Sequence, residues 1–400
     1  MLNHAARILK TVQAGTPADQ ALRESLVRTR HYSAPAERRA ISRAVFAYFR
    51  WWRWLEPKDS LQKQLEAART LQARFDKNPA SFKPEALAAR AVPEWFSETI
   101  FWPEVGAVAP NGPRALEGKR PYPTEVALLR QLQREPALWI RAKQGLAAKV
   151  AASLGHCAPA ELGVPLSALS SQLSARAYTG LTDLYRTPEF QAGEFEIQDL
   201  ASQLVGLACA PQPGETWWDA CAGEGGKSMH LSDLMQNKGL LWVSDRSERR
   251  LAKLKERAAR AKVFNFRAAP WQGDAKLPTK TKFDGVLVDA PCSGIGTWQR
   301  NPHARWTTRP TDVHELAAVQ ARLLDHAAGS LKPGGRLVYA VCTLTRAETT
   351  AIADAFTAAH PDFEPALVFS AQHSALSTQF FLWPHELNAN GMFIAAWRRK

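Results

Sequence analysis

From about residue 190 onward, short apolar runs alternate with longer segments of helical periodicity, and this alternation constrains the fold more than any other feature. The predicted strands are 216–220, 240–244, 264–268, 283–288 and 336–341, and predicted helices 227–236 and 248–262 separate the first three. Strands that alternate with helices in this way are typical of βαβ units. The sequence therefore predicts a parallel, doubly wound α/β sheet over residues 191–400.

The first half of the chain divides into three parts. Residues 1–100 carry apolar side chains at helical spacing and predict an all-α domain. Residues 101–124 contain five prolines and no periodicity, which predicts a linker or long loop. Residues 125–190 mix two predicted helices with a short predicted strand at 137–143, so we expect a small α+β subdomain there.

Two cysteine-bearing phrases stand at the ends of predicted strands. Residues 289–294 read D-A-P-C-S-G, and residues 339–344 read Y-A-V-C-T-L. Ligands bind at the carboxyl ends of the strands in a parallel α/β sheet. Cys292 and Cys342 could be two buried, inert thiols, but Pro291 before one thiol and Gly294 after it favour a chemical role.

The first predicted strand leads into a glycine-rich turn that opens a helix. Residues 219–227 read D-A-C-A-G-E-G-G-K, which is neither a P-loop nor the G-x-G-x-x-G of a nicotinamide site. Asp245 follows the second strand, twenty residues after Gly225, and Asp274 and Asp289 follow the next two strands. Acids after successive strands predict a nucleoside-type site, although Asp274 could equally cap a local turn.

The net charge of the chain is +13 and its pI is about 9.7, which favours a polyanionic partner such as RNA. A predicted helix near residues 35–53 carries Arg38, Arg39, Arg43, Arg50 and Arg53 on one face, and this face is either solvated or directed at RNA. Fourteen tryptophans are present. Some can stack on bases, and most are expected in the core or at interfaces.

Several classes of protein fit the sequence poorly. It contains no apolar run long enough to span a bilayer and no secretory apolar stretch, so we expect a cytoplasmic protein without a membrane partner. Its five cysteines show no C-x-x-C spacing, so neither a zinc site nor a disulfide framework is expected. We expect a monomer that binds no metal.

Taken together, these motifs resemble those of the RsmB/Sun (RsmB/NOP) family of S-adenosylmethionine-dependent RNA cytosine-5 methyltransferases, over most of the chain. The family phrase D-x-C-A-x-P-G-G-K-T appears at 219–228 with Glu224 in place of proline and Ser228 in place of threonine, and D-A-P-C-S-G-x-G is intact at 289–296. The family phrase Y-x-T-C-S-L corresponds to residues 339–344, with Val341 in place of threonine and Thr343 in place of serine. The resemblance implies a Rossmann-like class I methyltransferase sheet, an RRM-like α+β subdomain before it, and an N-terminal domain similar to the NusB-like RNA-binding helices.

The resemblance also implies a mechanism. Cys342 would add to carbon 6 of cytosine, Cys292 would help to remove the carbon 5 proton, and Asp289 would hydrogen-bond the ring nitrogen. Lys227 would add positive charge that favours the thiolate. The residues implied to hold S-adenosyl-L-methionine are Cys221, Ala222, Gly223, Glu224, Gly225, Gly226, Lys227, Asp245, Arg250, Asp274 and Asp289.

We therefore expect a methyl transfer to carbon 5 of a cytosine in RNA, with ribosomal RNA favoured over tRNA by analogy with the NusB-like part. One alternative is a non-catalytic RNA-binding or ribosome-assembly factor on the same fold. Its support is Glu224 and the acidic pair after the second cysteine, which is reduced to Glu348 followed by two threonines. Another alternative is a methyltransferase that acts on a small molecule, which the charge and the helical N-terminal part disfavour.

Overall fold

The computed structural model describes residues 1–28, 34–103, 123–163, 166–369 and 377–400. The chain forms two compact units. The first contains residues 1–136, 181–183 and 297–309, and the second contains 137–180, 184–296 and 310–400. Most of the predicted linker, residues 104–122, lies outside the described residues.

The first unit is helical. Its longer helices are amphipathic, and the apolar faces of α1 and α3 bury Leu9 and Ile41. The helices are α1 (Leu2–Gln13), α2 (Ala18–Arg28), α3 (Pro35–Arg50), α4 (Leu61–Lys77), α5 (Pro84–Arg90), α6 (Phe96–Thr99), α7 (Pro123–Gln133) and α13 (Ala304–Thr307), with short 3-10 turns at Trp52–Trp54 and Pro79–Ser81.

Two predictions for this part of the chain differ from the structure. Helix α7 packs against α5 and belongs with the helices, whereas we expected it in the α+β subdomain. The predicted arginine face is also wrong at Arg50, which is buried and donates to Gln72 Oε1 at 3.1 Å. A helical spacing of arginines therefore did not reveal that this one points into the core.

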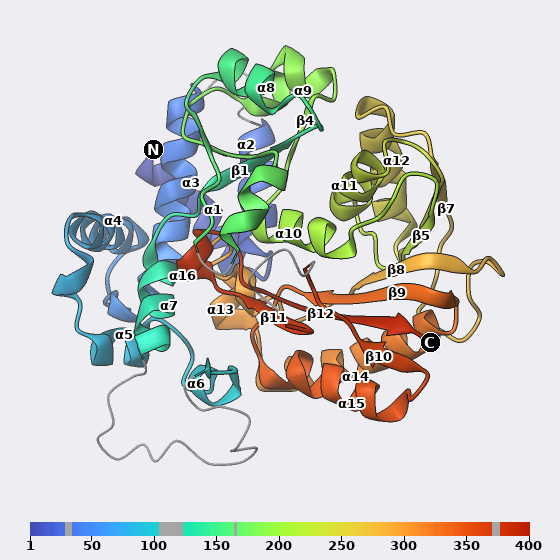
Figure 1. Ribbon diagram of the computed structural model, residues 1–400. Coiled ribbons are helices and arrows are strands. Elements are labelled where there is room, and N and C mark those ends of the chain that lie inside the picture. Colours follow the sequence, from blue (N-terminus) through green and yellow to red (C-terminus); the bar gives the residue numbers. More distant parts are fainter. Residues whose placement is uncertain (29–33, 104–122, 164–165, 370–376) are drawn as a thin grey trace. The chain divides into compact units, whose positions relative to one another are not determined.

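A small antiparallel sheet opens the second unit. Its strand order is β2-β3-β1-β4, and every neighbouring pair is antiparallel. The strands are β1 (Leu138–Ala142), β2 (Cys157–Pro159), β3 (Ala175–Tyr178) and β4 (Phe195–Ile197), and helices α8 (Ala147–Leu154) and α9 (Pro188–Gln191) pack against them. Figure 1 shows these helices beside the small sheet, and short 3-10 turns lie at Ser167–Gln172 and Leu184–Arg186.

The large sheet has the order β10-β12-β9-β8-β5-β6-β7, with β11 paired to β12. Its strands are β5 (Thr216–Asp219), β6 (Leu240–Val243), β7 (Phe266–Ala268), β8 (Phe283–Asp289), β9 (Leu331–Val341), β10 (Phe363–Pro365), β11 (Gln379–Leu382) and β12 (Met392–Arg399). The predicted parallel arrangement holds for β5 to β9. Strand β12, which was not among the five predicted strands, pairs antiparallel with β9.

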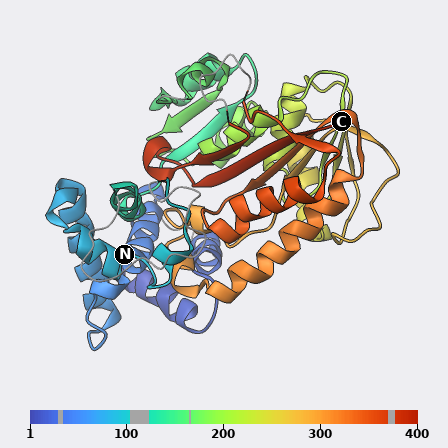
Figure 2. The same cartoon turned by 60° about the horizontal axis from the view of Figure 1, so that its bottom comes forward.

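Helices cover both faces of the large sheet. Alternate strand residues point to opposite faces, so Trp217 packs with one cluster and Trp218 with the other. The first cluster includes residues of α10 (Leu200–Cys209), α11 (Gly226–Leu234) and α12 (Glu248–Arg260), and the second includes residues of α14 (Pro310–Ala328) and α15 (Thr350–Ala359). Figure 2 shows α14 and α15 along one face.

Three shorter segments complete the second unit. They are helix α16 (Pro384–Leu387) and the 3-10 turns Ile295–Thr297 and Arg346–Glu348, the first of which ends one residue inside the helical unit. Both turns follow strands that carry the cysteine phrases. The carboxyl edge of the large sheet is therefore where the predicted site residues meet.

Candidate active site

The loop between β5 and α11 requires its glycines. Gly223 and Gly225 have φ values of +57° and +85°, in the region that side chains disfavour. A Cβ at Gly225 would lie 2.6 Å from Leu254 Cγ, whereas a Cβ at Gly226 would meet nothing within 4 Å. The first turn of α11 therefore faces open space, as a loop that receives a ligand must.

Asp245 lies just beyond β6 with its carboxylate held by the backbone. Its Oδ2 accepts from the N–H of Gly223 at 3.0 Å, and its Oδ1 accepts from the N–H of Ser247 at 2.8 Å. Arg250 Nη1 lies 3.5 Å from Oδ2. The structure thus brings together three residues that the sequence predicted for cofactor binding: Gly223, Asp245 and Arg250.

Asp219 at the end of β5 is a functional candidate that the sequence analysis did not single out. Its carboxylate is fully buried, and Oδ2 accepts from Ser228 Oγ at 2.7 Å. The other oxygen, Oδ1, has no hydrogen-bond partner within the described part of the chain. Burial raises the pKa of Asp219 to about 7. Its position at the head of the D-A-C-A-G phrase was the available signal.

Lys227 and Asp289 form an ion pair between α11 and the end of β8. Lys227 Nζ lies 2.7 Å from Asp289 Oδ2, and the two side chains are 12% and 27% exposed. Burial alone lowers the pKa of Lys227, but the charge and hydrogen bond of Asp289 outweigh it and hold the pKa above its usual value. Lys227 is therefore a fixed positive charge.

The sulfur atoms of Cys292 and Cys342, the two predicted catalytic cysteines, lie close together. Residues 288 and 289 of β8 lie beside residues 339 and 340 of the parallel strand β9, so the loops that follow start side by side. Cys292 Sγ lies 3.3 Å from Cys342 Sγ, and both side chains are half-buried. The hydrogen bond to Cys342, burial and the charge of Cys342 raise the pKa of the Cys292 thiol well above its usual value, so Cys292 keeps its proton.

Glu348 joins the two thiol loops, a role that sequence reasoning missed. Its buried carboxylate accepts from the Ser293 N–H at 2.8 Å and from Gln320 Nε2 at 3.0 Å through Oε1. Through Oε2 it accepts from Thr343 Oγ1 at 3.0 Å and from Thr345 Oγ1 at 2.9 Å, as well as from Ser293 Oγ at 2.5 Å. Residues directly after both cysteines are therefore fixed by one side chain.

For three residues predicted to bind the cofactor, the structure shows less support from side-chain contacts. The Asp274 side chain is exposed, and its carbonyl accepts from Trp271 Nε1 at 3.0 Å. Glu224 is half-buried and its carbonyl accepts from Arg257 Nη1 at 2.9 Å, so the position where the family phrase has proline is tied to α12. Burial and the charges of Asp219, Asp289 and Asp245 raise the pKa of Cys221 well above its usual value, as expected for an inert thiol.

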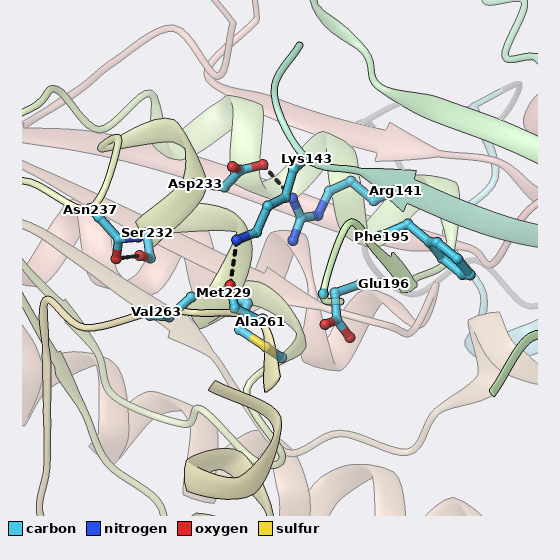
Figure 3. A pocket seen from close by; sticks show the side chains of 11 residues that line it. Arg141, Lys143, Phe195, Glu196, Met229, Ser232, Asp233, Asn237, Ala261 and Val263 are labelled. Carbon is cyan, nitrogen blue, oxygen red and sulfur yellow. Dashed lines mark hydrogen bonds and ion pairs between the residues drawn. The ribbon is translucent and has the colours of Figure 1, made fainter. Parts of the chain in front are cut away.

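A small cavity lies away from this edge, between β1 of the small sheet and helices α11 and α12. Figure 3 shows Arg141 directed at Asp233 and Lys143 at the carbonyl of Ala261. Its volume of about 20 Å³ is room for one water molecule at most. It is a polar seam within the second unit and not a substrate site.

Within the ranges that the structure describes, no group of three or more His, Cys, Asp or Glu side chains could hold a metal ion. In the same ranges, no helix combines the length and apolar character needed to cross a bilayer.

Comparisons with known proteins give matches to part of the chain. Residues 206–398 match the family model described as 16S rRNA methyltransferase RsmB/F. The probable ribosomal RNA small subunit methyltransferase B of Bacillus subtilis (strain 168) is 38% identical over 221 residues, which cover 53% of this chain and 49% of that protein. That of Synechocystis sp. is 35% identical over 246 residues, covering 59% and 55%. The chain spans about half the length of these curated relatives.

A solved structure supports the fold. The crystal structure of PH0851 superposes with a TM-score of 0.73 at 22% identity and covers 100% of this chain and 97% of that one, a likeness that shows the fold alone. The β5 loop, Asp245 and the paired sulfurs described above all lie within residues 206–398, the segment that matches the family model of 16S rRNA methyltransferase RsmB/F.

Proposed function

We propose that the protein transfers a methyl group from S-adenosylmethionine to carbon 5 of a cytosine in ribosomal RNA, through a covalent bond to Cys342. The observation that carries the proposal is the 3.3 Å approach of the Cys292 and Cys342 sulfurs at the ends of adjacent parallel strands. Curated relatives are named as methyltransferases of small-subunit ribosomal RNA, which supports the choice of RNA.

The loops after β5 and β6 fit the proposed methyl donor. The Asp245 carboxylate, fixed by two backbone N–H groups, suits the ribose hydroxyls of a nucleoside. The buried Asp219 Oδ1 without a partner is an acceptor that a ligand N–H would satisfy. When bound, S-adenosylmethionine supplies a methyl group on a positively charged sulfur, which makes that carbon electrophilic.

Cys342 would supply the nucleophile, because carbon 5 of cytosine is unreactive in the intact aromatic ring. A bond from Cys342 Sγ to carbon 6 moves ring electrons toward carbon 5, which can then accept the methyl group. Asp289 is proposed to hydrogen-bond the ring nitrogen that gains a proton when the Cys342 sulfur adds. The positive charge of Lys227 acts on Cys342 and favours the thiolate form of the nucleophile.

Cys292 would complete the cycle by taking the proton from carbon 5. The hydrogen bond to Cys342, burial and the charge of Cys342 hold the proton of Cys292 in the free protein. Once Cys342 is bonded to carbon 6, the two contributions of Cys342 disappear, which favours loss of the Cys292 proton to water, and the thiolate can then accept the proton from carbon 5. The Cys342–carbon 6 bond then breaks and restores the ring.

The target base has to leave any stack to reach such a site, because carbon 6 and carbon 5 are covered in a duplex. The proposed substrate is therefore a cytosine in a loop or in a helix that opens.

The test is methyl transfer from labelled S-adenosylmethionine to small-subunit ribosomal RNA. Cys342→Ala should lower turnover by at least about 10³-fold, since no other group replaces the nucleophile. Cys157→Ala, which changes a thiol of the small sheet, serves as the matched control and should keep turnover. Full turnover by Cys342→Ala, or label at a position other than carbon 5 of cytosine, would refute the proposal.

A further inference from the structure

The helical unit contains a hollow that the proposed chemistry does not use. Its volume is about 740 Å³, and its lining includes Trp52, Arg53, Arg90, Trp95, Arg305 and Trp306. All of these residues belong to the first unit, although two of them come from the segment 297–309. That segment continues directly from the D-A-P-C-S-G-x-G phrase of the thiol loop.

The aromatic side chains of the hollow are held rather than loose. Trp52 is 45% exposed and meets Trp306 edge to face, with ring centroids 5.3 Å apart. Trp306 Nε1 donates to the Phe49 carbonyl at 2.7 Å, which fixes the plane of the ring. Rigid, partly exposed indole rings are platforms on which any nucleobase can stack.

The charges of the hollow are mostly positive. The Arg53 guanidinium lies 5.3 Å from the Trp306 ring centroid, and its ion pair with the exposed Glu94 at 3.7 Å is weak. Arg90 is exposed. Arg53 Nη1 also donates to the Ala89 carbonyl at 3.3 Å, an exposed contact that leaves its other guanidinium nitrogens available to an anion.

Arg305 adds a buried charge. It is fully buried and donates to the carbonyls of Ala91, Leu132 and Trp298, and its Nε has no hydrogen-bond partner among the described residues. A buried cation held by carbonyls alone keeps an unbalanced positive charge. An anionic group in the hollow would be stabilised by it.

We propose that this hollow binds an unpaired nucleotide of the RNA substrate, with its base stacked on Trp52 and its phosphate near Arg53, Arg90 and Arg305. The inference rests on the proposed function, because it takes the substrate to be RNA. Stacking needs an exposed base face, so single-stranded RNA fits the site and a duplex does not.

The experiment measures the affinity of the full chain for a fluorescein-labelled twelve-nucleotide adenylate RNA, which contains no cytosine and so cannot undergo the proposed methylation. Trp52→Ala should weaken binding about tenfold, which corresponds to about 1.4 kcal/mol. Arg53→Ala should weaken it and reduce the slope of log affinity against log salt by about one. With ribosomal RNA, Trp52→Ala should raise KM and leave kcat unchanged.

Matched controls are Phe264→Ala, an exposed aromatic residue of the second unit, and Arg69→Ala, an exposed arginine of the first. Neither should alter binding. The inference is overturned if Trp52→Ala binds the adenylate RNA as tightly as the unaltered protein does, or if Phe264→Ala weakens binding as much as Trp52→Ala. It is also overturned if Trp52→Ala weakens binding of duplex RNA as much as binding of the single strand. If the unaltered protein transfers no methyl group to ribosomal RNA but Trp52→Ala still weakens adenylate binding about tenfold, the proposed function is refuted and the nucleotide site is supported.

Discussion

The two halves of the carboxyl edge of the large sheet are built differently. In the cofactor half, after β5 and β6, backbone N–H groups hold the carboxylate of Asp245, and positive-φ glycines shape the loop. In the thiol half, after β8 and β9, a single buried side chain, Glu348, fixes residues after both cysteines. Binding of the donor should therefore depend on local loop geometry, whereas alignment of the sulfurs should depend on one carboxylate.

The sharpest test of this difference is Glu348→Gln. An amide keeps the size of the side chain but replaces one acceptor oxygen by a donor, so at least two of the donors around it lose their partner. We expect a loss of about 3 kcal/mol in the free energy of unfolding and a kcat lower by about 10²-fold. The affinity for S-adenosylmethionine, measured by calorimetry, should stay within about twofold because its loops are separate.

Glu364→Gln is the matched control, since it makes the same change at an exposed position of β10. A Glu348→Gln protein that is destabilised but keeps its kcat at a temperature where it is folded would show that Glu348 has only a structural role. Equal losses in kcat and donor affinity would break the distinction between the two halves.

Asp245→Asn probes the cofactor half. The amide has one acceptor oxygen where the carboxylate has two. Either a backbone N–H or a ribose hydroxyl of S-adenosylmethionine therefore loses its acceptor. We expect the affinity for S-adenosylmethionine to fall about tenfold to fiftyfold, with kcat at saturating donor little changed. Asp362→Asn, at an exposed position, should leave both unchanged. A fall in kcat without a change in donor affinity would contradict the assignment of Asp245.

The last prediction concerns the stability of the glycine loop and not activity. Gly225→Ala places a methyl group 2.6 Å from Leu254 Cγ at a φ of +85°, so it should lower the free energy of unfolding by about 3 kcal/mol. Gly214→Ala has a φ of +95° but meets nothing within 4 Å, and it should cost about 1 kcal/mol. Urea unfolding of both variants measures the difference. Equal losses would mean that contact with Leu254 does not shape the loop.

The sequence predicted much of this edge because its signals are local. A strand followed by an acid or a cysteine places that side chain at the carboxyl edge, and the pairs Lys227–Asp289 and Cys292–Cys342 were found there. The Glu348 interactions were missed because Ser293 and Glu348 are 55 positions apart and no periodicity links them. The available signal was a lone carboxylate after two hydroxyl residues, Thr343 and Thr345, which we interpreted as the remnant of an acidic pair.

Other features also depended on long-range packing. The antiparallel strand β12 could not be distinguished from a parallel one by its apolar run, since both are buried on two faces. Arg305 and Arg50 are ordinary arginines in the sequence, and only the packing of the helical unit buries them. Charge counts therefore predicted an anionic partner but not which arginines face it.

The most direct measurement concerns the adduct on Cys342. Cys292→Ala should be able to form the bond to carbon 6 and accept the methyl group, but it should release product slowly because carbon 5 keeps its proton. Incubated with ribosomal RNA and S-adenosylmethionine, this variant should give a protein–RNA band that survives denaturing electrophoresis, and Cys292→Ala/Cys342→Ala should give none. A band that persists in the double variant, or rapid turnover of Cys292→Ala with no band, would contradict the account.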